Sequence, residues 1–343
     1  MGPTMKAAVL HGPGPPDSFA IEDVPIPSVG PDDVLVRVAA CGVSYRDVVE
    51  RNGTYKRDVS FPAILGLEIS GTVVSIGVDV LDLEIGDRVC TKAFISCGRC
   101  RLCRSGRETT CARRAPVKGG YAEYVALPQD AFVKFPETIS FESACSLGPG
   151  AGVALNALRD TAKVQIGETV LITGATGGVG VPGVQIAKAV GARVIAVTRS
   201  EGKRAFLQEL GADDVLIAPD GENFAPEARR LTGGLGVDVV LDNVGSRVFN
   251  PCFDSLAVHG RYAMVGQLFG EEISINPARI FFKRAQILGV GSVSRAQLAD
   301  VIALAARGIV TPQVAEVMPL AQVARAHALV EGGAVSGRVI LQP

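Results

Sequence analysis

Apolar and polar positions alternate over short stretches in the first 140 or so residues of the chain. Runs of strand length stand at Val34 to Ala40, Ile69 to Ile76 and Tyr121 to Leu127, and Gly and Pro residues interrupt them. No helical period persists in this part. The pattern predicts an irregular β domain.

From about Thr169 the pattern changes to apolar runs separated by segments long enough for crossover helices. Continuous apolar runs of this kind are typical of buried strands in a parallel sheet. The fold class is therefore α/β, with a doubly wound parallel sheet of the Rossmann type. The predicted strands are Val170 to Thr173, Arg193 to Val197, Asp214 to Ile217, Val237 to Leu241 and Tyr262 to Val265.

After Gly289 the pattern predicts one helix and a last strand. Ser294 is a suitable N-cap for a helix with Leu298, Val301, Ile302 and Ala305 on one stripe, which Arg307 and Gly308 would end. The last strand is predicted at Ser336 to Leu341. Since these elements are too few to fold alone, we expect residues 289–343 to complete a first domain of residues 1–145. Residues 146–288 would form the second domain.

Length and charge narrow the choice of partners. With 343 residues the chain suits two domains, and a hydrophobic content of 48% can build their cores. The 34 basic and 35 acidic residues nearly cancel. The net charge of the chain therefore does not favour nucleic acid or an anionic membrane as a partner. We expect a small-molecule substrate.

Targeting signals and disulfides are also not expected. The first residues lack a long apolar stretch behind a basic segment, and no run of about 18 apolar residues follows later. Of the eight cysteines, four are clustered and Cys41, Cys90, Cys145 and Cys252 are scattered among apolar neighbours. This distribution indicates one metal site and buried thiols in a reducing, cytoplasmic compartment.

A glycine-rich turn separates a predicted strand, Glu168 to Thr173, from a predicted helix at about Val179 to Val190. Gly177 would let the backbone approach a pyrophosphate, and Gly180 would let the helix pack on the strand. The N-terminus of the helix supplies N–H donors to a phosphate. An ordinary strand-to-helix turn is the alternative. The candidate cofactor-binding residues are Ala175, Gly177, Gly178, Val179, Gly180 and, after a later strand, Gly266.

The end of the second strand of this sheet distinguishes NADPH from NADH. An NAD site places Asp or Glu about 20 residues after the turn to bind the ribose 2′-hydroxyl. This chain has Thr198, Arg199 and Ser200 there, followed by Lys203. These side chains can bind a 2′-phosphate, so we expect NADPH. Solvated basic residues at a helix start are the alternative.

Four cysteines follow a metal-ligand spacing, Cys97-x2-Cys100-x2-Cys103-x7-Cys111. Four thiolates can close a tetrahedral shell around Zn²⁺, which leaves no position for water or substrate. We therefore expect one structural zinc per chain. A disulfide cluster is the alternative, which a reducing compartment disfavours.

The chain resembles the medium-chain dehydrogenase/reductase superfamily nearly from end to end. The resemblance rests on Gly66-Leu67-Glu68, Gly86-Asp87-Arg88-Val89, the four cysteines, the turn Ala175-x-Gly177-x-x-Gly180 and Ser336-Gly337-Arg338. It implies a catalytic domain with an irregular, chaperonin-like β barrel beside a Rossmann domain. The superfamily includes zinc alcohol dehydrogenases and zinc-less quinone or enoyl reductases.

The resemblance also implies that the catalytic zinc is missing. Zinc alcohol dehydrogenases have Cys where this chain has Ser44, and His where it has Leu67. Their third ligand would fall near Pro149, which offers no donor. Cys41 and Cys145 remain alternative, displaced ligands, but His11, His259 and His327 stand in unrelated segments.

Four residues are candidates for binding and protonating the substrate. Without a Lewis acid the substrate must be polarised by hydrogen bonds, which suits hydride addition to an electron-poor C=C bond. The candidates are Ser44, Tyr45, Arg46 and Tyr55, with Tyr45 or water as the proton source. The alternatives are that Tyr45 packs in the barrel and that Asp47 caps a helix or pairs with Arg46.

Two further features follow from the resemblance and from charge. Glu68 and Arg338 match a family pair whose Arg reaches the cofactor pyrophosphate, with a plain ion pair as the alternative. A basic stretch could contact a CoA phosphate or simply be solvated; it comprises Arg99, Arg101, Arg104, Arg107, Arg113, Arg114 and Lys118.

The favoured function is NADPH-dependent reduction of a quinone, an enone or a short enoyl-CoA. A zinc-independent carbonyl reductase or alcohol dehydrogenase, or a catalytically silent NADPH-binding protein, are the alternatives. We expect a homodimer or homotetramer built through the strand near Gln286 to Val290, because a bare sheet edge favours symmetric pairing.

Overall fold

The structure is a computed structural model that describes residues 2–54, 59–219 and 222–343. The chain forms two compact units. Unit 1 comprises Met1–Gly152, Ser292–Gly308 and Pro312–Pro343, and unit 2 comprises Val153–Gly291 and Ile309–Thr311. The chain therefore leaves unit 1, builds unit 2 and returns.

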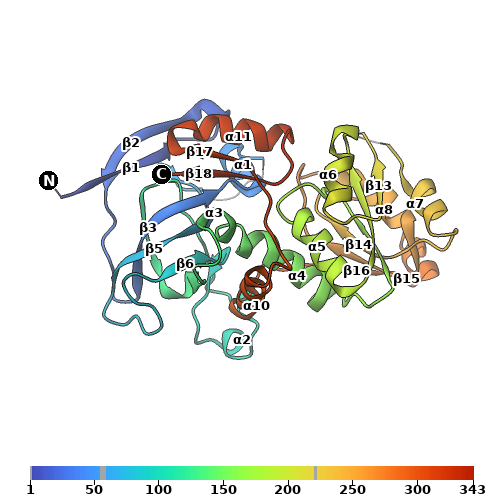
Figure 1. The fold of residues 1–343 in the computed structure, drawn as a ribbon, viewed down its shortest axis with the longest axis horizontal. Coiled ribbons are helices and arrows are strands. Elements are labelled where there is room, and N and C mark those ends of the chain that lie inside the picture. Colours follow the sequence, from blue (N-terminus) through green and yellow to red (C-terminus); the bar gives the residue numbers. More distant parts are fainter. Residues whose placement is uncertain (1, 55–58, 220–221) are drawn as a thin grey trace. The chain divides into compact units, whose positions relative to one another are not determined.

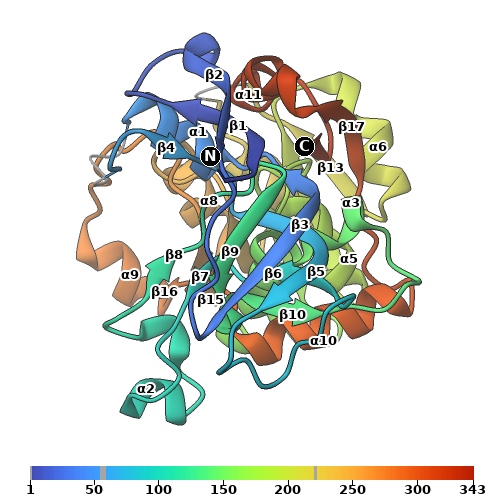
Figure 2. The same cartoon turned by 90° about the vertical axis from the view of Figure 1, so that its left-hand side faces the viewer.

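Unit 1 is built on a largely antiparallel sheet, whose strand β3 (Asp33–Gly42) shows why it forms. Its alternate residues Val34, Val36, Val38 and Ala40 are buried, the period of a strand with one face in a core. Figure 2 shows β3 crossing this sheet. In spatial order the described strands are β10 (Phe132–Lys134), β6 (Arg88–Thr91), β5 (Glu68–Ile76), β3, β18 (Arg338–Gln342) and β17 (Val314–Pro319), with β9 (Tyr124–Pro128) also paired to β3.

Two smaller sheets and short helices complete unit 1. One sheet has the order β2 (Phe19–Pro25), β1 (Thr4–Leu10), β4 (Ala63–Ile64), and the other pairs β7 (Phe94–Ile95) with β8 (Ala115–Pro116). The α-helices are α1 (Tyr45–Asn52), α2 (Arg101–Arg104), α3 (Phe141–Ala144), α10 (Arg295–Ala306) and α11 (Val323–Gly332). The short 3-10 turns are η1 (Pro16–Ser18), η2 (Glu108–Thr110), η3 (Gln129–Ala131) and η8 (Leu320–Gln322), and η4 (Leu147–Gly152) is a π-helix.

Helix α1 lies in the first 140 residues, where the sequence showed no persistent helical period. Ser44 and Asp47 form a capping box at its start, and Gly53 ends it with φ of 71°. Eight residues are too few to establish a helical period in the sequence, so the caps were the only signal. The predicted helix after Ser294 is present as α10, and Ser294 and Gln297 form its capping box.

Unit 2 is a parallel sheet with helices on both faces (Figure 1). Its described strands have the order β13 (Asp214–Ile217), β12 (Arg193–Thr198), β11 (Thr169–Ile172), β14 (Val237–Asp242), β15 (Leu256–Met264), β16 (Gln286–Gly289). The order reverses beside β11, the position at which doubly wound sheets bind ligands. The helices and turns are α4 (Val153–Leu155), η5 (Asn156–Thr161), α5 (Gly180–Val190), η6 (Glu201–Lys203), α6 (Arg204–Glu209), α7 (Ala225–Leu231), η7 (Ser246–Val248), α8 (Phe249–Ser255) and α9 (Pro277–Lys283).

The predicted α/β fold class is confirmed. Each unit has its own apolar core: one lies around Leu67, Ile69 and Phe132, and the other around Leu171, Val240 and Phe253. Across the described ranges, no helix has the length and apolar character needed to cross a membrane.

Candidate active site and metal centre

Ser44 occupies the N-cap of α1 and is bound to Asp47. The backbone N–H and the hydroxyl of Ser44 donate to Asp47 Oδ2 at 2.9 and 2.5 Å, and Ser44 Oγ accepts from the Asp47 N–H at 3.3 Å. Burial raises the pKa of Asp47, while the Ser44 donors oppose that shift. The hydroxyl proton of Ser44 therefore points to Asp47.

The other oxygen of Asp47 ties α1 to the segment Gly66-Leu67-Glu68. Asp47 Oδ1 accepts from the Gly66 N–H at 3.1 Å. Gly66 has φ of 91°, and a Cβ there would lie 2.6 Å from the ring of Tyr121 and 2.8 Å from Cys41 Sγ. Only glycine fits this position, which explains the first residue of the motif.

Leu67, at the position of the missing histidine ligand, packs into the hydrophobic core of unit 1. Its side chain is buried, and Thr91 Oγ1 donates to its carbonyl at 2.7 Å. Thr91 also contacts η4, which carries Pro149, because a Cβ on Gly148 would lie 2.1 Å from the Thr91 carbonyl oxygen. The segments that hold Leu67 and Pro149 thus meet at Thr91.

The two displaced-ligand candidates lie in tight packing. Cys41 is fully buried against Gly66 and Gly120, and burial raises the pKa of its thiol well above the usual value. Cys145 packs with Ala40 and Ile340, and burial likewise raises its pKa. In the part of the chain that the structure describes, only Cys97, Cys100, Cys103 and Cys111 form a group of three or more close metal-binding side chains.

The other candidate catalytic residues are only partly located. Tyr45 is the first residue of α1 and is half-buried. Arg46 pairs through Nε with Glu50 Oε1 at 2.9 Å, one helical turn later, and its charge also acts to lower the pKa of Asp47. Tyr55 lies outside the described residues.

Glu68 and Arg338 form a buried ion pair. Burial lowers the pKa of Arg338 to about 10. Beyond that pair, Arg338 Nε and Glu68 Oε2 are buried with no hydrogen-bond partner among the described residues. Buried polar atoms usually have a hydrogen-bond partner, and a bound cofactor phosphate would supply one for Arg338. This contact stays a prediction.

The glycine-rich turn between β11 and α5 is closely packed. The Gly177 N–H donates to the Gly174 carbonyl at 2.9 Å. A Cβ at Gly180 would lie 2.3 Å from that same oxygen and 2.6 Å from Ala175 Cα. Gly180 therefore allows the close approach of α5 to the strand, as the phosphate-binding turn requires.

Two basic side chains gather where β12 ends, next to this turn. Lys203 Nζ donates to Thr176 Oγ1 of the turn at 3.4 Å. Burial, and then the nearby charge of Arg199, lower the pKa of Lys203. The acidic Glu201 is bound instead by Arg204. Thr198 is buried at the strand end and Ser200 is exposed. An anion at this place would relieve the repulsion between two cations.

Asp242 is a structurally important residue of this edge that sequence reasoning missed. The Thr173 hydroxyl and the Tyr262 hydroxyl each donate to its carboxylate at 2.7 Å, and the Val244 N–H donates at 2.9 Å. Burial raises its pKa despite these donors. The carboxylate fixes the loop after β14, against which Gly266 packs. An acid at the end of the otherwise apolar run Val239 to Leu241 was the available signal.

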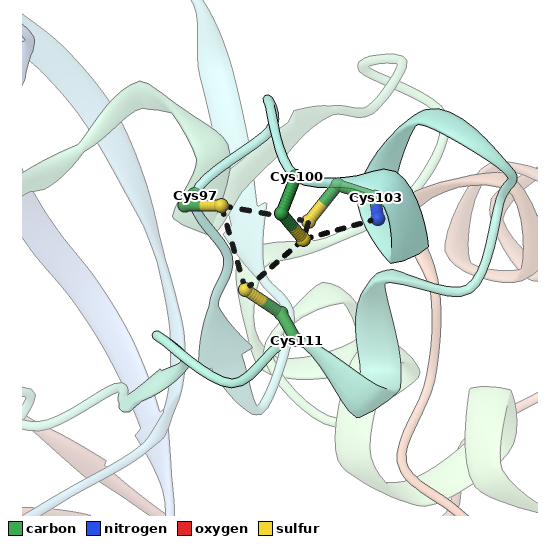
Figure 3. A group of neighbouring side chains, drawn as sticks. All are labelled: Cys97, Cys100, Cys103 and Cys111. Atoms are coloured by element: carbon green, nitrogen blue, oxygen red, sulfur yellow. Dashed lines mark hydrogen bonds between the residues drawn. The ribbon is translucent and has the colours of Figure 1, made fainter.

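The four clustered cysteines come together in one lobe, residues 97–111, called the cysteine lobe below (Figure 3). The sulfurs lie 3.4 Å apart for Cys100 and Cys103, 3.5 Å for Cys111 and Cys97, and 3.9 Å for Cys97 and Cys103 and for Cys100 and Cys111. A tetrahedral shell with Zn–S bonds of about 2.3 Å has edges of roughly 3.8 Å. The lobe fits a zinc ion.

Donors around the lobe favour thiolates. The backbone N–H of Arg99 leads several donors that lower the pKa of Cys97 to about 6. Backbone N–H of Cys103 similarly lowers the pKa of Cys100, whereas burial raises that of Cys103 to about 11. Arg113 donates to Cys97 Sγ at 3.2 Å, while Arg99, Arg101, Arg104 and Arg107 are exposed.

Comparisons with known proteins agree with this architecture. A family model of the alcohol dehydrogenase GroES-like domain matches residues 30–137, and one of zinc-binding dehydrogenases matches residues 178–307. The chain is 31% identical to an acryloyl-coenzyme A reductase of Sulfurisphaera tokodaii, over 99% of this chain and 100% of that protein. It is 34% identical to an NAD-dependent alcohol dehydrogenase of Sulfolobus acidocaldarius, over 98% and 99%. The crystal structure of AibC superposes with a TM-score of 0.92 at 41% identity, covering 99% of this chain and 96% of that one.

The chain belongs to the medium-chain dehydrogenase/reductase superfamily. It is an oxidoreductase of that type, and members of the superfamily bind a nicotinamide cofactor and act on small molecules.

Proposed function

We propose that this protein uses NADPH to reduce a C=C bond conjugated to a carbonyl, without a catalytic zinc. The carrying observation is the state of the three positions that would hold that zinc. Ser44 is bound to Asp47, Leu67 is part of the core, and Pro149 has no donor. The relatives that are acryloyl-coenzyme A reductases support a short enoyl-CoA, and an enone or a quinone has the same electrophilic β-carbon.

The proposal assigns separate tasks to the two units. Unit 2 binds the cofactor through the turn at Gly174 to Gly180, and Arg199 and Lys203 bind the 2′-phosphate. Unit 1 holds and protonates the substrate, and Arg338 reaches the pyrophosphate. When bound, NADPH supplies the hydride. The limits expected from the sequence were residues 1–145 with 289–343, and 146–288, whereas the two compact units divide after Gly152 and after Gly291, and Ile309–Thr311 belongs to unit 2.

Among the candidate donors, Tyr45 is assigned on the chemistry of its side chain. The Ser44 hydroxyl donates a hydrogen bond to Asp47, and Arg46 donates to Glu50. Tyr45 starts α1 directly after Ser44, and its phenol can donate a hydrogen bond to a carbonyl oxygen. Tyr45 is therefore the proposed group that polarises the carbonyl and protonates the product, with Tyr55 as a further donor.

The decisive experiment measures NADPH consumption with acryloyl-CoA, simple enones and quinones, and identifies the product. A saturated carbonyl product supports the proposal. An alcohol product, or zinc-stimulated alcohol oxidation, would establish the second candidate, a carbonyl reductase or alcohol dehydrogenase, which the NAD-dependent relative favours. Cofactor binding without turnover would indicate a silent NADPH-binding protein.

Replacing Tyr45 by Phe tests the assigned donor. General acid catalysis contributes roughly 100-fold or more to a rate, so kcat should fall by at least about tenfold even if water partly substitutes. NADPH affinity should not change, since unit 2 is untouched. An unchanged kcat in Tyr45→Phe would mean that Tyr55 or water is the proton donor.

Assembly and location complete the proposal. Strand β16 is the edge of the sheet of unit 2, and Ile287 on it is 39% exposed. We propose that this edge pairs with a second copy in a cytoplasmic homodimer or homotetramer, because pairing removes a bare edge. Sedimentation as a monomer at micromolar concentration would contradict it.

A further inference from the structure

Four charged residues at the base of the cysteine lobe carry an inference beyond the proposed chemistry. They are Lys92, Asp130, Glu108 and Arg295, called the charge quartet below, and all belong to unit 1. Each lies within the electrostatic range of the Lys92 ammonium, and their formal charges cancel. These four residues connect the cysteine lobe to two other segments of unit 1.

The first connection joins the quartet to the start of the lobe. Asp130 Oδ2 accepts three hydrogen bonds: from Lys92 Nζ at 2.9 Å, from the Ser96 N–H at 2.6 Å and from the Ser96 hydroxyl at 3.0 Å. Lys92 is fully buried, and Ser96 directly precedes Cys97. Asp130 therefore fixes the backbone from which the first metal-binding cysteine extends.

The second connection joins the middle of the lobe to helix α10. Glu108 lies between Cys103 and Cys111, and its Oε1 accepts from the Arg295 N–H at 2.7 Å. Arg295 is the first residue of α10, where a carboxylate satisfies a free N–H and interacts favourably with the helix dipole. The Arg295 side chain donates to the carbonyls of Gln129 and Asp130 at 3.2 and 3.3 Å.

Beyond the quartet, both connections lead to the positions of the lost catalytic zinc. Helix α10 packs against η4, which carries Pro149, and a Cβ on Gly152 would lie 2.4 Å from Val293 Cγ2. Lys92 follows Thr91, which binds the backbone beside Leu67 and contacts η4. The lobe is thus linked to the walls of the candidate active site by contiguous contacts.

We propose that the charge quartet couples zinc occupancy of the cysteine lobe to the order of the segments that hold Leu67 and Pro149. Asp130 and Glu108 are positioning residues in this coupling. Coupling between sites is reciprocal. If the contacts of the quartet with α10 and η4 strengthen zinc binding by a given free energy, zinc binding must stabilise those contacts by the same free energy.

The first test measures zinc affinity of the full chain by competition with a chromophoric chelator. Asp130→Asn removes the counter-ion of a buried ammonium, and Glu108→Gln weakens the cap of α10. Both should weaken zinc binding by roughly 5- to 100-fold, the range of ordinary coupling. Asp130→Glu, which keeps the charge, should recover part of the affinity.

Asp23→Asn is the matched control. Asp23 also pairs with a lysine, at 2.7 Å from Lys6 Nζ, but both side chains are more than half exposed and remote in sequence from the lobe. It should leave zinc affinity unchanged. If Asp130→Asn does not fold, Glu108→Gln still decides. Equal affinity in wild type, Glu108→Gln and Asp23→Asn overturns the proposal, and a wild type that holds no zinc overturns it with the zinc assignment.

The second test follows amide hydrogen exchange in zinc-loaded and zinc-stripped wild type. Removal of zinc should speed exchange in η4 and in the first turn of α10, and leave helix α5 of unit 2 unchanged. Uniform change in both units would mean general destabilisation, and no change in η4 and α10 would mean no coupling. Either result contradicts the proposal, and neither depends on the reaction that the enzyme catalyses.

Discussion

The cysteine lobe and the segments of Ser44 and Leu67, where zinc alcohol dehydrogenases bind their catalytic zinc, have opposite surroundings. At the cysteine lobe four sulfurs converge, three of the four cysteines are only partly buried, and backbone N–H groups stabilise thiolates. At the other position Leu67 and Cys41 are buried in apolar packing, and Ser44 is used to cap a helix. Because Leu67 is packed in the core and Ser44 is bound to Asp47, a single substitution should not create a metal site there.

The largest expected effect comes from removing one ligand of the retained site. In Cys103→Ser the shell is incomplete, and elemental analysis should find far less than one zinc per chain, against about one in wild type. Cys145→Ala removes a buried thiol outside the lobe and should keep the metal. Full zinc content in Cys103→Ser would remove the distinction between the two positions.

The next effect comes from an attempt to rebuild the lost site. Leu67→His places a polar ring in the core and should lower the free energy of unfolding by about 2–4 kcal/mol, without adding a second zinc. Denaturant unfolding and elemental analysis measure the two quantities. Leu67→Met, of similar volume, should cost less than about 1.5 kcal/mol. A second zinc in Leu67→His would show that one histidine at this position is enough to create a metal site, against the comparison drawn above.

A smaller effect concerns the end of β12, where charged side chains again surround an expected ligand. Arg199→Ala should weaken NADPH binding by about 1.5–3 kcal/mol, the range for a hydrogen bond to a charged group, and leave NADH binding unchanged. Titration of each cofactor measures this. Arg204→Ala, which removes an arginine bound to Glu201, is the control. An equal loss for both cofactors would exclude a 2′-phosphate contact.

The smallest expected effect concerns the stability of the protein at low pH and His327, a buried histidine that is not a metal ligand. His327 Nδ1 lies 3.3 Å from Arg51 NH1, so it must accept, and Nε2 then donates to the Tyr121 hydroxyl at 3.1 Å. Burial lowers the pKa of His327 to about 3. Both ring nitrogens are occupied, and the ring stays neutral at ordinary pH.

The pH dependence follows from that shift. Below about pH 6.5 the unfolded chain binds a proton at His327 that the folded protein refuses until about pH 3, so stability falls with falling pH in this window. The slope should approach about 1.4 kcal/mol per pH unit for this group. His327→Gln should remove that share of the slope between pH 6 and 5, measured by denaturant unfolding. An unchanged slope would mean that His327 is protonated in the folded protein.

The sequence by itself determined the fold class, the turn at Gly174 to Gly180, helix α10 and the grouping of the four cysteines. These features follow from short-range rules: apolar period, capping residues, glycine at close approaches and ligand spacing. Only the resemblance to a family, and no local rule, indicated that Ser44 and Leu67 stand where zinc alcohol dehydrogenases have catalytic metal ligands.

Tertiary structure alone decided how those positions are used. The hydroxyl of Ser44 is bound to Asp47 because a capping box starts α1, a helix too short to show a period in the sequence. Asp130 and Glu108 meet Ser96 and Arg295 across separations of 34 and 187 residues. No local pattern encodes such pairings, because folding brings charges together that the sequence keeps far apart, and burial then sets their protonation.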